Sequence, residues 1–112
     1  MARTPLLPRR PNQTLGVIWG AHPFSISLGY DLATGRILEV FADTPKGGQM
    51  QATLADACVL ISLALQHGLA PEVLQKSLAR EPDPALGGTA EIPASPIGAI
   101  LAVLVAEAAV LQ

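Results

Sequence analysis

The sequence is poor in charge and in aromatic side chains. Of its 112 residues, 14% are charged and 4% are aromatic, whereas 50% are hydrophobic. Typical domains carry about 25% charged residues, and disordered chains combine low hydrophobicity with high charge. The composition therefore excludes an intrinsically disordered chain and predicts one folded domain. This small number of charged residues would leave much of the surface apolar. We therefore also expect part of the apolar surface to contact a partner, most simply a second copy in a homodimer.

Cysteine is almost absent. Cys58 is the only one, which excludes an internal disulfide and a zinc module built from cysteine pairs. It lies on an apolar helical stripe, where burial makes a thiol inert, so we interpret it as a core residue. The two histidines, His22 and His67, show no metal-ligand spacing with Cys58. We expect no metal and no cofactor.

Acidic residues are missing from the N-terminus. The first ten residues hold three of the seven bases, Arg3, Arg9 and Arg10, so four bases face all nine acids in the remainder, a net charge of −5. The overall charge of −2 disfavours a strongly basic nucleic-acid binder. We interpret residues 1–12, which hold three prolines, as an extended basic arm before a single domain over residues 13–112. The arm is either a solvated terminus or a contact to DNA or protein.

Segments that indicate a membrane or export are not found. The N-terminal stretch is too short and too rich in proline for a signal peptide. Residues 97–112 form an apolar run that Glu107 interrupts, somewhat short of the roughly 20 residues that cross a bilayer. We expect a cytoplasmic protein that does not enter a membrane.

A β-hairpin is the clearest local pattern. Residues His22–Tyr30 alternate apolar and small polar side chains, as a half-buried strand does. The turn Asp31–Gly35 leads into a return strand, Arg36–Ala42, whose alternation slips by one position and predicts a bulge near Glu39. The sequence also predicts a short strand over residues Gln13–Trp19.

Helices are predicted after the strands. Residues Met50–His67 carry an apolar stripe and are apolar on other faces too, which predicts a central, buried helix that Gly68 ends. A second helix, Pro71–Arg80, opens on a proline. We interpret Glu81–Ala94 as a loop because prolines and glycines crowd it.

Ser95 is a suitable N-cap for a third helix, Pro96–Gln112. Strands that precede helices predict an α+β fold. We expect a small antiparallel sheet of two to three strands around a central hairpin, followed by three helices packed on it.

The best candidate site is the turn before the long helix, which reads TPKGGQ and comprises Thr44, Lys46, Gly47, Gly48 and Gln49 with Pro45. Adjacent glycines expose backbone N–H groups just before a helix N-terminus, where the helix dipole favours an anion, and the lysine adds positive charge. The P-loop pattern GxxxxGK[ST] is absent. The turn therefore predicts a phosphate or nucleotide site, and the alternative is a connection that needs glycine for its shape.

Signatures of catalysis are missing. The sequence has no GxSxG nucleophile elbow. Glu39 and Asp43 are the nearest pair of carboxylates, on or just after one strand, and Trp19 and Tyr30 are too few for a base-stacking platform. We expect a protein that is not an enzyme.

Two segments, FSISLGYDLATGRILEVFADTPKGGQ and LADACVLISLALQHGLAPEVLQKSL, resemble the TSCPD domain. This domain occurs near the C-terminus of adenosylcobalamin-dependent (class II) ribonucleotide reductases and as small free-standing proteins. The shared features are the Gly-rich hairpin, the Glu-Val-Phe strand at Glu39, the Lys-Gly-Gly turn at Lys46 and the helix that reads ISLALQHG. The resemblance covers roughly residues 9–105.

The departures from the family limit what the resemblance implies. The cysteine-containing motif that names the domain is absent, and ribonucleotide reduction needs a radical cysteine and a reducing pair where this chain has Cys58 alone. The resemblance thus implies a shared domain without reductase activity. We expect it to bind a nucleotide or phosphorylated ligand, with Tyr30 and Arg36 near the turn, or to regulate a partner. The alternative is a dimeric protein- or DNA-interaction module that uses the basic arm and the apolar helices.

Overall fold

A three-stranded antiparallel sheet, in the order β1-β2-β3, forms the centre of the protein. The computed structural model describes residues 12–45, 47–87 and 89–110. The predicted arm with Arg3, Arg9 and Arg10, and also Lys46, lie outside the described residues. The strands of this sheet are β1 (Asn12–Trp19), β2 (His22–Tyr30) and β3 (Ile37–Asp43).

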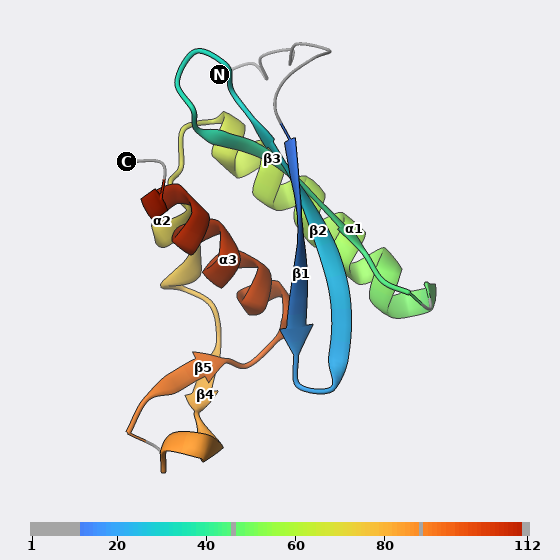
Figure 1. Ribbon diagram of the computed structural model, residues 1–112, viewed down its shortest axis with the longest axis vertical. Helices are drawn as coiled ribbons and strands as arrows, with labels where there is room; N and C mark the ends of the chain where they lie inside the picture. Colours follow the sequence, from blue (N-terminus) through green and yellow to red (C-terminus); the bar gives the residue numbers. More distant parts are fainter. Residues whose placement is uncertain (1–11, 46, 88, 111–112) are drawn as a thin grey trace.

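The described residues also form three helices and a small second sheet (Figure 1). The helices are α1 (Gly48–Gln66), α2 (Pro71–Gln75) and α3 (Pro96–Val110). The second sheet is a hairpin of β4 (Arg80–Pro82) and β5 (Glu91–Pro93), with a 3-10 turn, η1 (Pro84–Leu86), between its strands. The α+β prediction is confirmed, and the structure has the upper number of strands predicted for the main sheet.

The predicted hairpin is confirmed, including its bulge. Gly29 pairs with Glu39 but Tyr30 pairs with Ile37, so Leu38 is the extra residue. At the turn, the Asp31 carboxylate accepts hydrogen bonds from the backbone N–H of Ala33 and from the Thr34 hydroxyl. These two hydrogen bonds lower the pKa of Asp31. The bulge changes which face each side chain of β3 occupies. Phe41 is consequently 55% exposed, while its neighbours Val40 and Ala42 are buried.

The second helix and the following loop differ from the prediction. We predicted that the helix would continue to Arg80, but α2 ends at Gln75, and Arg80 begins β4. The segment predicted as a loop, Glu81–Ala94, contains most of the β4–β5 hairpin. Strands of three residues that include proline are too short to show an alternating pattern, which is why the sequence did not reveal them.

The core lies between one face of the sheet and the helices. The inner face is formed by alternate residues of β2, and α3 contributes side chains that are at most 1% exposed. The inner side chains of β2 are Phe24, Ile26, Leu28 and Tyr30, and those of α3 are Ile100, Leu101 and Leu104. The hydroxyl of Ser95 accepts a hydrogen bond from the N–H of Gly98 at 3.1 Å, so the predicted cap of α3 is confirmed.

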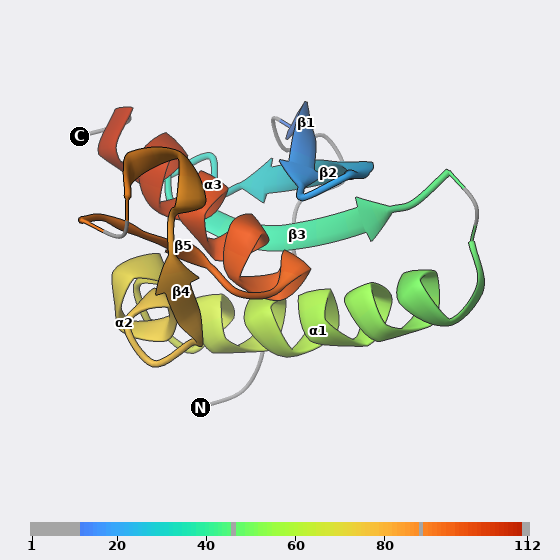
Figure 2. The ribbon, with the colours of Figure 1, turned by 90° about the horizontal axis from the view of Figure 1, so that it is seen from below.

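Helix α1 lies along β3 (Figure 2) and buries only one of its faces. Leu54, Cys58 and Leu65 are at most 2% exposed, whereas Val59 is 55% and Leu60 68% exposed. The prediction of a helix buried nearly all round is therefore wrong. Apolar composition predicted burial, but a helix at the margin of a three-stranded sheet has neighbours on one side only.

Side chains of α1 also bond the free backbone edge of β3. The Ser62 hydroxyl accepts from the N–H of Val40 at 3.0 Å and donates to its carbonyl at 3.3 Å. The Gln66 amide donates to the Leu38 carbonyl at 2.9 Å, and the Gln51 amide donates to the Ala42 carbonyl at 3.0 Å. Together they take the place of a fourth strand.

We predict that Ser62→Ala lowers the free energy of unfolding by about 1–3 kcal/mol, because it leaves the buried N–H and C=O of Val40 unsatisfied. Ser62 gives a cleaner test than Gln66, whose buried Oε1 atom has no partner among the described residues. Urea unfolding measures the change. The matched control is Ser77→Ala, at an exposed serine. Equal stabilities of the two variants would refute the role of Ser62.

Candidate functional site

The TPKGGQ turn is tied firmly to the first turns of α1. The Gln51 side-chain oxygen accepts hydrogen bonds from the backbone N–H of Thr44 at 2.7 Å and from its hydroxyl at 3.0 Å. The N–H of Gly47 donates to the Thr44 carbonyl at 3.3 Å. These hydrogen bonds hold Thr44 and Gly47 against the start of α1 and orient the helix N-terminus relative to the end of β3.

The two glycines of the turn are required by its backbone. Gly47, the N-cap of α1, has φ 61° and ψ −144°, and Gly48 has φ 76°. L-residues with a side chain rarely adopt such values, so both positions need glycine for shape, as the alternative interpretation of the turn stated. Within the described residues, no side chain caps α1 and no acid lies in its first turn. The N–H groups of that turn are consequently available to an anion.

A cavity of about 330 Å³ adjoins this turn. The turn between β1 and β2, the TPKGGQ turn and the start of α3 surround it, and its lining is largely apolar, with His22, Pro23, Phe24, Thr44, Gly47 and Met50 among the residues. The ring of His22 stacks on Trp19, with centroids 5.9 Å apart. The indole N–H of Trp19 donates to the Pro93 carbonyl at 3.3 Å, which fixes this pair relative to β5.

Tyr30 and Arg36 do not belong to this site. They lie at the end of the hairpin where Tyr30 pairs with Ile37, whereas the turn follows the opposite end, where Ser25 pairs with Asp43. Our expectation that Tyr30 and Arg36 lie near the turn is wrong, because an antiparallel strand separates its two ends by its full length, about 20 Å for β3.

Both side chains have structural partners instead. The Tyr30 hydroxyl donates to the Gln13 side-chain oxygen at 2.8 Å, and burial, with the charge of Glu107, raises the pKa of Tyr30. The Arg36 guanidinium donates to the Leu65 carbonyl at 3.2 Å. A cation at the last carbonyls of α1 also interacts well with the helix dipole.

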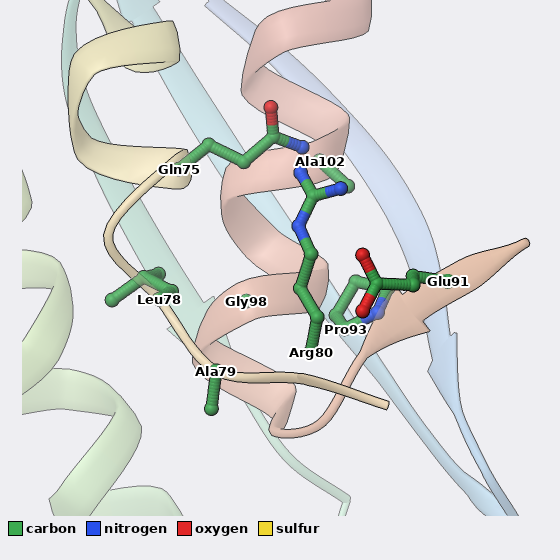
Figure 3. Close-up of a pocket in the computed structure, with 8 residues that line it drawn as sticks. All are labelled: Gln75, Leu78, Ala79, Arg80, Glu91, Pro93, Gly98 and Ala102. Atoms are coloured by element: carbon green, nitrogen blue, oxygen red, sulfur yellow. The ribbon is translucent and has the colours of Figure 1, made fainter. Parts of the chain in front are cut away.

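A second cavity, of about 180 Å³, lies among α2, the β4–β5 hairpin and α3 (Figure 3). The Gln75 and Arg80 side chains extend toward one another across it, and Glu91 lies beside Arg80. Arg80 was not among the residues predicted for a site, because its place facing Gln75 and Glu91 depends on a hairpin that the sequence pattern does not show. A carboxylate beside the guanidinium makes this cavity a poorer anion site than the TPKGGQ turn.

Cys58 is a core residue, as predicted. It is 2% exposed, and burial raises the pKa of its thiol from 9.0 to about 11. In the part of the chain that the structure describes, no three His, Cys, Asp or Glu side chains are grouped so that they could hold a metal ion. By length and composition α1 could cross a membrane, which is weak evidence because core helices meet the same criterion.

We predict that Cys58 alkylates about 100-fold more slowly in the folded protein than in urea at pH 8. The thiolate is the reacting form, and a pKa raised from 9.0 to about 11 reduces its population by about that factor. Iodoacetamide labelling followed by mass spectrometry gives the rates. The control is Thr53→Cys in a Cys58→Ala background, which places a thiol at an exposed position of the same helix. Equal rates for the two folded proteins would contradict the burial of Cys58.

Comparison with known proteins gives one finding. A sequence model of the TSCPD domain matches residues 3–107 of the 112-residue chain. No curated protein and no solved structure matches the chain. The match includes the hairpin, the TPKGGQ turn and all three helices, apart from the last residues of α3. The chain belongs to the TSCPD domain family.

Proposed function

We propose that this TSCPD-domain protein is a non-catalytic module that binds a nucleotide or another phosphorylated ligand at the TPKGGQ turn. The observation that carries the proposal is the position of the 330 Å³ cavity, which is lined by Thr44 and Gly47 of the turn itself. An apolar cavity beside a helix N-terminus offers both kinds of contact that a nucleotide needs.

The phosphate would lie against the first turn of α1. Its backbone N–H groups carry the positive end of the helix dipole, and neither a side-chain cap nor a first-turn acid competes for them in the described part of the chain. Lys46 stands between Pro45 and Gly47 in the sequence and supplies the charge that an anion requires. Glycine at positions 47 and 48 leaves no side chain over the backbone there.

The base or other apolar part of the ligand would enter the adjoining cavity. Phe24 and Met50 give it apolar contacts, and the His22 ring, held on Trp19, gives it an aromatic edge.

Cys58, the only thiol, is buried with a raised pKa, so it is unsuited to act as a nucleophile. Binding without turnover, in the cytoplasm, is therefore the function we propose, with regulation of a partner as its use.

We predict that calorimetry with inorganic phosphate, nucleosides and nucleoside triphosphates detects binding, tightest for ligands that carry both a base and phosphates. Lys46→Ala should weaken nucleotide binding about tenfold or more, since a charge-assisted contact contributes about 1.5–3 kcal/mol. The matched control is Lys76→Ala, at an exposed lysine just after α2. Absence of binding, or equal affinities for the two variants, would overturn the proposal.

The alternative function makes a separate prediction from the three arginines of the N-terminal arm. If the protein binds DNA through this arm, deletion of residues 1–10 should abolish a DNA mobility shift, and the shift should weaken steeply as salt rises. The same deletion should leave nucleotide affinity at the turn unchanged. Loss of nucleotide binding with the arm would place the ligand site elsewhere than we propose.

A further inference from the structure

The two edges of the main sheet differ in how their backbone groups are hydrogen-bonded. Along β3 and at Thr44, the residue that follows it, backbone groups of alternate residues from Leu38 onward are bonded by the α1 side chains described above. The opposite edge is β1, at the margin of the sheet farthest from α1 (Figure 2). Hydrogen bonds to the main chain of β1 from outside its own sheet are absent among the described residues.

The pairing with β2 identifies which backbone groups of β1 have no hydrogen bond within the described part of the sheet. Ile18 pairs with Pro23, and proline has no N–H, so this pair cannot exchange the two hydrogen bonds of a bonded pair. Bonded and non-bonded pairs alternate along an antiparallel ladder, so the N–H and C=O groups of the even-numbered residues point away from β2. These residues, all exposed, are Asn12, Thr14, Gly16 and Ile18.

The edge of β1 lacks the features that keep edge strands from pairing. Its eight residues, NQTLGVIW, include no charge and no proline, and its register with β2 runs from Asn12 to Trp19 without a bulge. Monomeric proteins usually place lysine, proline or a bulge on such an edge. Ile18, moreover, is 75% exposed. The strand is long, regular and uncharged, which is the form that accepts another strand.

We propose that β1 pairs antiparallel with β1 of a second copy, so that two three-stranded sheets join into one. A second copy fits because an antiparallel edge is complementary to itself after a two-fold rotation. An uncharged strand also meets its own copy without repulsion between like charges. This surface is distinct from the ligand cavity, and the inference does not depend on the proposed function.

The alternation of free groups fixes the register. Bonded pairs must join even-numbered residues. When all four of these residues are bonded, Asn12 pairs with Ile18 of the second copy and Thr14 pairs with Gly16 of the second copy. The two-fold axis then passes through Leu15, which faces Leu15 of the second copy in a non-bonded pair. Leu15 is half-buried and packs on the core, so its contact across the axis would extend the core between copies.

The first test is the mass in solution. The full chain should run as a dimer of about twice 11.6 kDa in light scattering or sedimentation. Thr14→Lys should convert it to a monomer, because it places a charge on the paired edge. The matched control, Thr53→Lys, makes the same change at an exposed position of α1 and should leave the dimer intact. A monomeric wild-type chain, or a dimer that survives Thr14→Lys, overturns the proposal.

The second test fixes the register and covers the case in which Thr14→Lys does not fold. In a Cys58→Ala background, Leu15→Cys should form an interchain disulfide on mild oxidation, since Cα atoms of a non-bonded pair lie about 4.5 Å apart. Thr53→Cys in the same background reports random collision and should crosslink far more slowly. Equal rates for the two variants overturn pairing at this register. The proposal would also be overturned if an added unrelated protein lowered the crosslinking rate while dilution did not, because β1 would then bind a partner other than a second copy.

Discussion

The structure depends on one constraint, the need to satisfy the free backbone edge of β3. A three-stranded sheet has two edges, and its buried or half-buried polar groups must find partners. Gln51, Ser62 and Gln66 supply them from a single stripe of α1. The apolar stripe beside it, which includes Leu54 and Leu65, enters the core at the same time. One helix therefore bonds the edge of the sheet and also covers the inner face of the sheet. These two sets of contacts fix the helix axis along β3.

The position of the candidate site follows from that alignment. Since α1 runs along β3 and is connected to it directly, the helix must begin beside the end of the strand. The connection is short, and it turns back sharply through Gly47 and Gly48, both at positive φ. The N-terminus of α1 consequently lies next to the β1–β2 turn and the start of α3, where the cavity forms. The other end of the helix meets Arg36, whose guanidinium bonds the Leu65 carbonyl.

The sequence predicted those parts of the fold in which one local pattern decides the structure. Strand β2 alternates over nine residues, and its bounds were predicted correctly because burial on one face imposes a period of two. The bulge was visible as a slip in the alternation of β3. The β4–β5 hairpin was not predictable, because strands of three residues in a segment rich in proline carry no period. The error about Tyr30 and Arg36 had another cause. Both residues are close to the turn in the sequence, but the full length of strand β3 separates them from it in space.

The scarcity of charge has causes within one copy as well as the contact between copies that composition alone suggests. Helix α3, the most uniformly apolar segment, directs Ile100, Leu101 and Leu104 into the core, so these side chains are accounted for within one copy. Helix α1 needs uncharged polar residues on its edge-bonding stripe, because a charge there would be buried against backbone dipoles without a counter-ion. Exposed apolar side chains among the described residues lie on several elements, such as Phe41 of β3 and Leu60 of α1, but β1 is a whole edge strand without a charge. Within one copy, no comparable contact among the described residues requires β1 to be uncharged. The two edges of the sheet differ in this respect, and we infer that pairing between copies is the physical reason why β1 carries no charge.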